Sequence, residues 1–248
     1  MKLLAASMQD SMLSSISSLS GVLDQSERSA GARIDSERDR RRFVASSILK
    51  RYLLSASCDW QVDPHDWVFE QGCEGKPVLS GKFYHLKLQF NVSHCDGLFV
   101  IAVQRQTPIG IHVESSGAAI GQVAARAIFT ERELACLDYS GQPTQQLKLW
   151  TLKAAYLKFL GVGLRKDPLD FDISALVASC TQPSRSGSPQ FSLSSWTMGV
   201  SGASYTLSVA AFEQFQYGSE VESRCFTSAD ELHASLGRTL KLSRELMG

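Results

Sequence analysis

Two residues with chemically active side chains, His112 and Glu114, stand two positions apart in segment 110–114, which reads Gly-Ile-His-Val-Glu. Side chains two apart on a β-strand point to the same face, so the imidazole and the carboxylate are predicted to face a site while Ile111 and Val113 face the core. An imidazole beside a carboxylate titrates near neutral pH and can transfer protons, and a carboxylate can bind a hard cation. The strand therefore predicts either acid–base chemistry or a metal site.

A second set of side chains belongs to a helix predicted over residues 145–160. Trp150, Ala154 and Lys158 follow each other at intervals of four, so they share one face of that helix. Lys158 places an ammonium on this face, whereas Ala154 contributes no functional group. The helix is predicted to end at the glycines of segment 161–163, because glycine readily adopts the left-handed conformation that closes a helix.

Three segments upstream offer hydrogen-bond donors for phosphate oxygens. Lys76 lies in a Gly-Lys-Pro turn, Ser93 and His94 end the segment 90–94, and a basic run at 38–42 opens a predicted helix. Each has an ordinary explanation by itself, since lysines in turns and arginines on helix faces are most often solvated. Their value as functional signals depends on their occurring together.

The composition excludes some classes of function. The 248 residues include 25 basic and 25 acidic side chains, so no overall field attracts nucleic acid or an acidic membrane surface. Six cysteines occur without a C-x-x-C pair or a cysteine–histidine cluster, and no apolar segment reaches the length of a signal sequence core or a membrane span. We expect a cytoplasmic, monomeric protein with reduced thiols and with no nucleic acid or membrane partner.

Hydrophobic periodicity and turn residues predict a mixture of helices and strands. Residues 11–30 predict a partly ordered lead-in or a short helix. Helices are expected over 35–55, 120–128 and 145–160, with a capped helix start formed by Thr130 and Glu133. Strands are expected over 83–90, 98–104, 107–114, 171–173, 191–193, 195–200 and 205–212, with 91–94 in a connection, 181–189 in a loop and 228–247 in a peripheral helix.

Five segments, in their order and spacing, resemble the surfactin-type 4'-phosphopantetheinyl transferases. The resemblance covers roughly residues 35–212 and rests on the basic helix start at 38–42, G-K-P at 75–77, F-N-V-S-H at 90–94, G-I-H-V-E at 110–114 and W-T-L-K-A-A-Y-L-K at 150–158. It implies an α+β fold of two pseudo-symmetric α+β halves with a coenzyme A cleft between them. The first half, 1–106, then holds a phosphate cradle, and the second, 107–248, holds the metal-site strand and the Trp150 helix.

The resemblance also implies roles for individual residues. In the family, a carrier-protein serine attacks the β-phosphate of coenzyme A while Mg²⁺ neutralises the pyrophosphate. Lys158 is associated with the serine and the transferring phosphate, Lys76 with a phosphate of the coenzyme, and Ser93 and His94 with its 3'-phosphate region. The implied coenzyme-binding residues are Arg41 or Arg42, Lys76, Ser93, His94 and Lys153.

The chain departs from the family at two of three metal-binding carboxylates. The family aspartate is His112 here, the family glutamate on the helix is Ala154, and only Glu114 remains. Histidine is a poor ligand for Mg²⁺ and alanine is none, so we expect weak or absent metal binding and impaired transfer. His112 then has two interpretations: a structural partner of Glu114 or a phosphate, or a general acid/base assisted by Lys158 at an enolate or oxyanion.

Three functions follow from these observations. The first is a protein that binds coenzyme A or a pantetheinylated carrier protein, has lost metal-dependent transfer, and uses His112 and Glu114 on a carrier-bound acyl intermediate in polyketide or peptide biosynthesis. The second is an active transferase that moves phosphopantetheine from coenzyme A to a carrier-protein serine through an unusual metal site. The third is a noncatalytic module that binds an acyl or peptidyl carrier protein.

Overall fold

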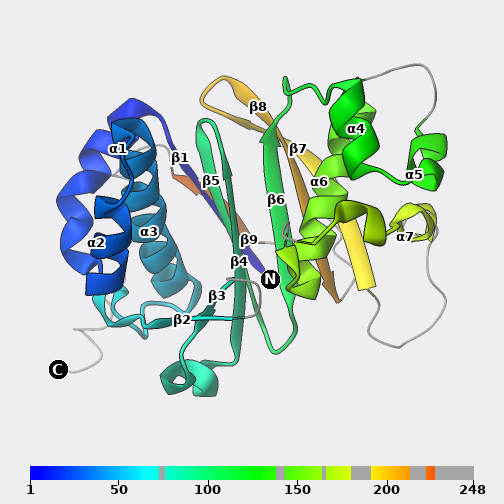
Figure 1. The fold of residues 1–248 in the computed structure, drawn as a ribbon. Helices are drawn as coiled ribbons and strands as arrows, with labels where there is room; N and C mark the ends of the chain where they lie inside the picture. Colours follow the sequence, from blue (N-terminus) through cyan, green and yellow to red (C-terminus); the bar gives the residue numbers. More distant parts are fainter. Residues whose placement is uncertain (73–75, 138–142, 164–165, 180–190, 213–221, 227–248) are drawn as a thin grey trace.

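The computed structural model describes residues 1–72, 76–137, 143–163, 166–179, 191–212 and 222–226. Within these residues the chain forms a four-stranded sheet, a three-stranded sheet and a two-stranded hairpin. Helices pack against both larger sheets, with α3 beside the first and α6 beside the second (Figure 1). This mixture of segregated helices and mainly antiparallel sheets confirms the predicted α+β class.

The first sheet has the strand order β4-β5-β1-β9. Its strands are β1 (Lys2–Ser7), β4 (Leu88–Cys95), β5 (Leu98–Arg105) and β9 (Glu222–Phe226). β5 lies antiparallel to both β4 and β1, whereas β9 runs parallel to β1. A segment from the late part of the chain therefore completes a sheet whose other strands come from its early part.

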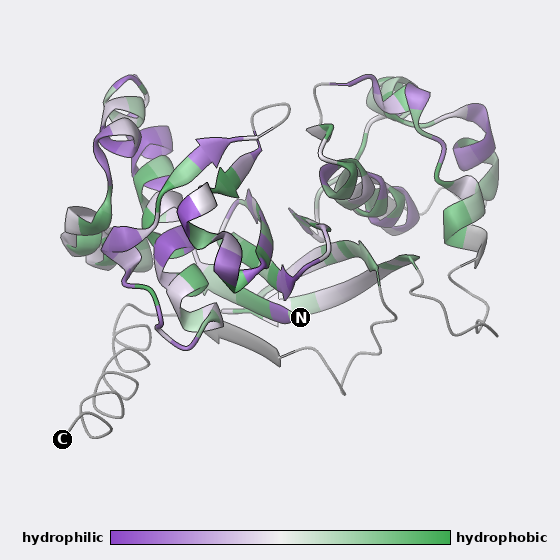
Figure 2. Ribbon diagram, turned by 90° about the horizontal axis from the view of Figure 1, so that it is seen from below, coloured by the Kyte–Doolittle hydropathy of each residue, from purple (hydrophilic) through white to green (hydrophobic). Residues whose placement is uncertain are grey.

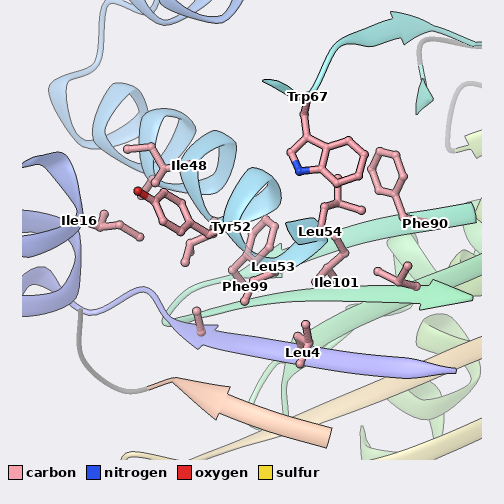
Figure 3. Close-up of a cluster of buried hydrophobic side chains, with 14 of the residues drawn as sticks. Leu4, Ile16, Ile48, Tyr52, Leu53, Leu54, Trp67, Phe90, Phe99 and Ile101 are labelled. Atoms are coloured by element: carbon pink, nitrogen blue, oxygen red, sulfur yellow. The ribbon is translucent and has the colours of Figure 1, made fainter. Parts of the chain in front are cut away.

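The long helix α3 (Glu37–Ser57) covers one face of this sheet, together with α1 (Asp10–Ile16), the 3-10 turn η1 (Ser17–Val22) and α2 (Gln25–Ala32). Apolar side chains on α3, including Ile48 and Leu53, meet Phe99 and Ile101 of β5 in the core between the two layers (Figure 3). All four side chains are buried, and the removal of their apolar surface from water stabilises this half.

Residues 58–87 connect α3 to β4. They contain the 3-10 turn η2 (Pro64–Asp66), the hairpin of β2 (Phe69–Gln71) and β3 (Pro77–Leu79), and the 3-10 turn η4 (Gly81–Leu86). The side chain of Trp67 is buried here, and its indole N–H donates to Ser55 Oγ at 2.8 Å. The hairpin is thereby attached to the end of α3.

The second sheet has the order β6-β8-β7 and consists of β6 (Ile109–Ser115), β7 (Phe191–Val200) and β8 (Ala203–Phe212). β8 is antiparallel to both of its neighbours. Helix α6 (Pro143–Leu160) lies against β6 and β8 (Figure 1). The remaining helices are α4 (Gln122–Ile128), α5 (Glu131–Cys136), the 3-10 turn η6 (Pro168–Asp170) and α7 (Ser174–Ser179).

Gly110 allows the close approach of α6 to β6. A Cβ atom at this position would lie 2.0 Å from the Ala155 carbonyl oxygen and 2.4 Å from the Phe159 nitrogen. Both neighbours are helix backbone, which cannot turn aside as a flexible side chain can. Glycine is therefore required here by the distance between helix and strand, and not by its backbone conformation.

The two larger sheets meet edge to edge along β4 and β6. Asn91 Oδ1 accepts a hydrogen bond from Ile111 N at 3.0 Å, and Ser93 Oγ accepts one from Val113 N at 3.2 Å. Residue numbers rise together across these two bonds, so β4 and β6 run parallel. Two side-chain oxygens thus take the place that main-chain carbonyls hold in an ordinary parallel pair.

Several sequence-based expectations for the first half were wrong. Residues 81–86 form the turn η4 and not the start of a strand, because Lys87 adopts the left-handed conformation (φ 53°) and closes that turn. Segment 91–94 belongs to β4 and not to a connection. The polar side chains that suggested a connection are used to join β6.

Other elements differ in extent. The expected lead-in over 11–30 forms α1, η1 and α2, anchored by the buried Met12 and Ile16. The sequence patterns predict no strand at β1. Segment 171–173 forms no strand, and 191–193 and 195–200 belong to one strand, β7. The strand over 98–104, the capping box of Thr130 and Glu133, and the helix over 145–160 are confirmed.

The described residues contain no helix that is both long and apolar enough to span a membrane. The expected loop at 181–189 and helix at 228–247 lie outside the described residues. The division of the chain at residue 106 stays a prediction: β6 begins just after it, at Ile109, whereas β9 adds to the first sheet.

We predict that Gly110→Ala strongly destabilises the protein. The new methyl group would force the backbones of α6 and β6 apart, and overpacking of this kind costs on the order of 3 kcal/mol. The free energy of unfolding, measured with a chemical denaturant, gives the effect. Gly117→Ala is the matched control, because a Cβ at Gly117 meets nothing within 4 Å. Equal stability of the two variants would contradict the close approach of α6 to β6.

Candidate functional site

His112 and Glu114 lie on the face of β6 that is turned toward α6. His112 Nε2 donates to Glu114 Oε1 at 3.1 Å, and the indole N–H of Trp150 donates to the same oxygen at 3.4 Å. The rings of His112 and Trp150 meet edge to face, with centroids 5.6 Å apart. One oxygen of Glu114 is therefore held by two N–H groups.

The other ring nitrogen of His112 is also engaged. Its Nδ1 lies 3.4 Å from Ser93 Oγ, and that hydroxyl already accepts a hydrogen bond from Val113 N. We therefore assign the hydroxyl proton to His112 Nδ1 and the imidazole proton to Nε2, which makes the ring neutral. Burial lowers the pKa of His112, which favours this neutral form, although the hydrogen bond to Glu114 acts in the opposite direction.

The carboxylate of Glu114 remains ionised beside this neutral ring. Its pKa is lowered, chiefly by the hydrogen bond from His112, against the opposing effect of partial burial. Trp150 and Lys158 lower the pKa further. The site thus holds one negative charge, and that charge is already stabilised by the protein.

Two partly buried lysines, Lys76 and Lys158, lie beside the junction of β4 and β6. Lys158 Nζ donates to Val92 O at 3.2 Å and to Ile111 O at 3.1 Å, one carbonyl from each strand. Lys76 Nζ donates to Ile109 O at 3.3 Å and to Lys158 O at 3.2 Å. Burial lowers the pKa of Lys76 and lowers that of Lys158 to about 8.

No carboxylate among the described residues forms an ion pair with either of these ammonium groups. Carbonyl oxygens satisfy two donors of each group, but they carry only partial charge. Glu114 interacts favourably with Lys158 at longer range. The junction therefore carries two cations against one carboxylate, which is the electrostatic character of an anion-binding site.

A cavity of about 430 Å³ lies between α3 and β4, beside this junction. We call it the α3 cavity; its wall includes Arg42, Phe43, Ser46, Lys50, Pro77 and His94. The Ser46 hydroxyl is buried and has no hydrogen-bond partner among the described residues, so it is available to a ligand. Burial lowers the pKa of His94, and Lys158 and Arg42 lower it further.

The two arginines considered from the sequence differ in position. Arg42 lines the α3 cavity and pairs with Asp96 on the neighbouring turn. Arg41 instead pairs with Glu37 at 2.8 Å on the outside of α3 and is not among the cavity residues. Of the pair, only Arg42 can reach a ligand in this cavity without moving.

Lys153 lies away from the junction, whereas the resemblance implied that it contacts the coenzyme. Its side chain is completely buried, and Nζ lies 2.6 Å from Glu133 Oε2. Glu133 also accepts from the main-chain nitrogens of Thr130 and Ile173, at 2.8 and 3.0 Å. Lys153 therefore stabilises the helices around α6, a role that the capping pattern at 130–133 only partly signalled.

The donor set does not fit Mg²⁺. Of the three positions that the sequence comparison with the family suggests, Ala154 has no ligand atom and is completely buried, and His112 uses both nitrogens in hydrogen bonds. The described residues contain no group of three or more histidine, cysteine or carboxylate side chains arranged to hold a metal. Glu114 alone is a weak site for a hard cation.

The fold and the site define a protein of two α+β parts whose junction favours an anionic ligand. Comparisons with known proteins agree with this class. Residues 10–106 match the family model described as "4'-phosphopantetheinyl transferase, N-terminal", and residues 108–210 match that of the "4'-phosphopantetheinyl transferase superfamily". The chain belongs to the 4'-phosphopantetheinyl transferase superfamily.

Individual relatives show the same similarity. The 4'-phosphopantetheinyl transferase HetI of Nostoc sp. is 31% identical over 62% of this chain and 65% of its own length. The 4'-phosphopantetheinyl transferase gsp of Aneurinibacillus migulanus is 28% identical, over 50% of this chain and 49% of its own length. The L-aminoadipate-semialdehyde dehydrogenase-phosphopantetheinyl transferase of Schizosaccharomyces pombe is 28% identical over 61% and 64% of the two lengths. The matches thus span about half to two thirds of these relatives.

We predict that Lys153→Met lowers stability without weakening coenzyme binding. Removing the ammonium leaves the buried carboxylate of Glu133 unpaired, which costs about 3–5 kcal/mol. Unfolding by denaturant measures the first effect and calorimetry with coenzyme A the second, at a temperature where the variant is folded. Lys148→Met, at an exposed position of the same helix, should change neither quantity. Weaker coenzyme binding by the folded Lys153→Met protein would return Lys153 to the binding site.

Proposed function

We propose that this protein binds coenzyme A, or the pantetheine arm of a carrier protein, at the junction of β4 and β6, and that metal-dependent transfer is impaired or lost. The observation that carries the proposal is the charge at the junction. The ammonium groups of Lys76 and Lys158 are partly buried and have no carboxylate partner among the described residues, while only Glu114 remains of the metal ligands found in the family.

The anion-binding part of the proposal follows from electrostatics. A partly buried ammonium interacts more strongly with a phosphate than an exposed one does, because its surroundings screen the charge less than water does. Lys158 and Lys76 each keep one N–H donor beyond the two carbonyl bonds described above. Arg42, Ser46 and His94 add donors along the α3 cavity, which is the part of the cleft that we assign to the nucleotide end of coenzyme A.

The loss of transfer follows from the missing carboxylates. A phosphoryl-type displacement needs positive charge at the reacting phosphate, and removing that stabilisation costs on the order of several kcal/mol of barrier. Relatives named as transferases favour the alternative that activity survives, so the transfer assay below decides between the two.

For His112, the structural interpretation is the better supported one. Both ring nitrogens hold hydrogen bonds, to Ser93 and to Glu114, so neither is free to accept a proton. Acid–base chemistry on a carrier-bound acyl chain in polyketide or peptide biosynthesis would first require one of these bonds to break. We therefore propose that His112 has a structural role and holds Glu114 in place through its hydrogen bond.

We predict that coenzyme A binding weakens as the pH rises through about 8, the pKa of Lys158. The ammonium is charged below this pH, and its favourable contact with phosphate is lost as it deprotonates above it. Once Lys158 titrates, the dissociation constant should rise by up to about tenfold per pH unit. Isothermal titration calorimetry between pH 6 and about 9.5 measures the profile.

Lys158→Met provides the matched test of this assignment. The variant should bind coenzyme A at least about tenfold more weakly at neutral pH, because a charge-assisted hydrogen bond is lost, and should show a flatter pH profile. Arg41→Met removes an exposed cation outside the cavity and should leave both unchanged. A wild-type affinity that stays constant up to pH 9.5 would contradict a role for the Lys158 ammonium.

We predict little or no gain of phosphopantetheine on apo carrier proteins incubated with this protein, coenzyme A and Mg²⁺. Mass spectrometry of the carriers measures transfer directly. The double variant His112→Asp, Ala154→Glu restores the two missing carboxylates and should recover part of the transfer, with each single variant recovering less. Transfer by the unaltered protein at the rate of an ordinary family member would overturn the proposed loss and establish the active-transferase alternative.

A further inference from the structure

The arginine and the lysine in the wall of the α3 cavity are each paired with a carboxylate from outside that wall. Arg42 pairs with Asp96, and Lys50 Nζ lies 2.9 Å from Glu27 Oε1. A phosphate that enters the cavity therefore meets cations whose charge is already compensated. It gains the full attraction of such a cation only where it can displace the carboxylate.

The two ion pairs differ in how easily the carboxylate can leave. The side chain of Glu27 is 9% exposed and also accepts from Arg51 Nε at 2.8 Å, so its release would leave a buried charge without its partner. The side chain of Asp96 is 68% exposed, whereas that of Arg42 is 27% exposed. Asp96 can therefore turn into water at little cost while the guanidinium stays in the cavity wall. Of the two cations, Arg42 is the one that a ligand can free.

Arg38, one helical turn before Arg42 on α3, offers Asp96 a second partner. Arg38 Nη2 lies 3.7 Å from Asp96 Oδ2, whereas Arg42 meets the other oxygen, Oδ1. Residues 37–42 of α3 are all charged, and Figure 2 shows hydrophilic residues (purple) beside hydrophobic ones (green) on the helices of this half, at the left. The charged start of α3 thus supplies another cation, to which the carboxylate turns when it leaves Arg42.

The main chain around Asp96 is held in place by its neighbours. Asp96 and Gly97 form the turn between β4 and β5, which lies beside the start of α3 (Figure 1). Met8 N donates to Gly97 O at 2.9 Å, and a Cβ atom at Gly97 would lie 2.5 Å from the Tyr205 hydroxyl oxygen. The turn is thus packed from two sides. A change of partner therefore needs only a rotation of the Asp96 side chain.

We propose that Asp96 is an internal counter-anion, which holds Arg42 in the free protein and gives it up to a phosphate group of the ligand. The inference rests on the proposed function, which assigns the nucleotide end of coenzyme A to the α3 cavity. Asp96 then competes with every anion that approaches Arg42. An anion held by Arg42 alone cannot offset the lost ion pair, whereas a ligand that also reaches Lys76 and Lys158 can. The ion pair therefore keeps small anions out of the free cavity.

Replacing the carboxylate by an amide of the same shape tests this competition. Asp96→Asn should bind coenzyme A at least about threefold more tightly than the wild type, because Arg42 is then free to meet the phosphate. Adenosine 3',5'-bisphosphate, which is the nucleotide end without the pantetheine arm, should show the same gain. Isothermal titration calorimetry at low ionic strength, where salt screens least, measures both affinities. Glu131→Gln removes one exposed negative charge from α5 and should change neither affinity.

A double-mutant cycle shows whether the effect passes through Arg42. In an Arg42→Met background, Asp96→Asn should change the coenzyme A affinity by less than about twofold, because no guanidinium remains to be freed. An equal gain in both backgrounds would overturn the proposal, since the carboxylate would then repel the ligand directly. Unchanged or weaker binding by Asp96→Asn alone would also overturn it, and would leave the proposed function intact. Failure of the wild type to bind coenzyme A would overturn both.

Discussion

The edge-to-edge contact of β4 and β6 is the interaction on which the rest of the site depends. Asn91 and Ser93 accept the N–H groups that β6 presents, and Lys158 donates to one carbonyl from each strand. Buried main-chain groups must find partners, so these three side chains are what allow two sheets to meet where neither supplies a complete ladder. The same bonds set the positions of His94 on β4 and Glu114 on β6 relative to one another.

Using side chains for this contact has an electrostatic consequence. A main-chain ladder would be neutral, whereas Lys158 introduces a full charge between the strands, and Lys76 adds another by donating to the carbonyl of Lys158. Burial opposes both charges and lowers both pKa values. An anionic ligand relieves this unfavourable state, so the bonds that join the sheets also favour phosphate binding.

Patterns of local spacing predicted much of the site, and long-range contacts explain what they missed. The period of two in 110–114 and the period of four from Trp150 placed Glu114, His112 and the α6 face correctly relative to one another. The partners of Lys76 could not be predicted, because they lie 33 and 82 residues away. The polar residues of segment 91–94 predict a connection, but they bind the neighbouring sheet, which no periodicity within the segment can reveal.

Two lysines on α6 show why residue type and motif position alone do not define a ligand site. Lys153 is completely buried and Lys158 is partly buried. Lys153 meets the carboxylate of Glu133 at 2.6 Å, whereas Lys158 meets only carbonyl oxygens. A full ion pair leaves no net charge for a ligand. Breaking this pair would leave the Glu133 carboxylate buried without a charged partner. Partial charges on carbonyls leave the second ammonium uncompensated. The identity of the partner, and not of the lysine, therefore separates the structural residue from the one that can meet a phosphate.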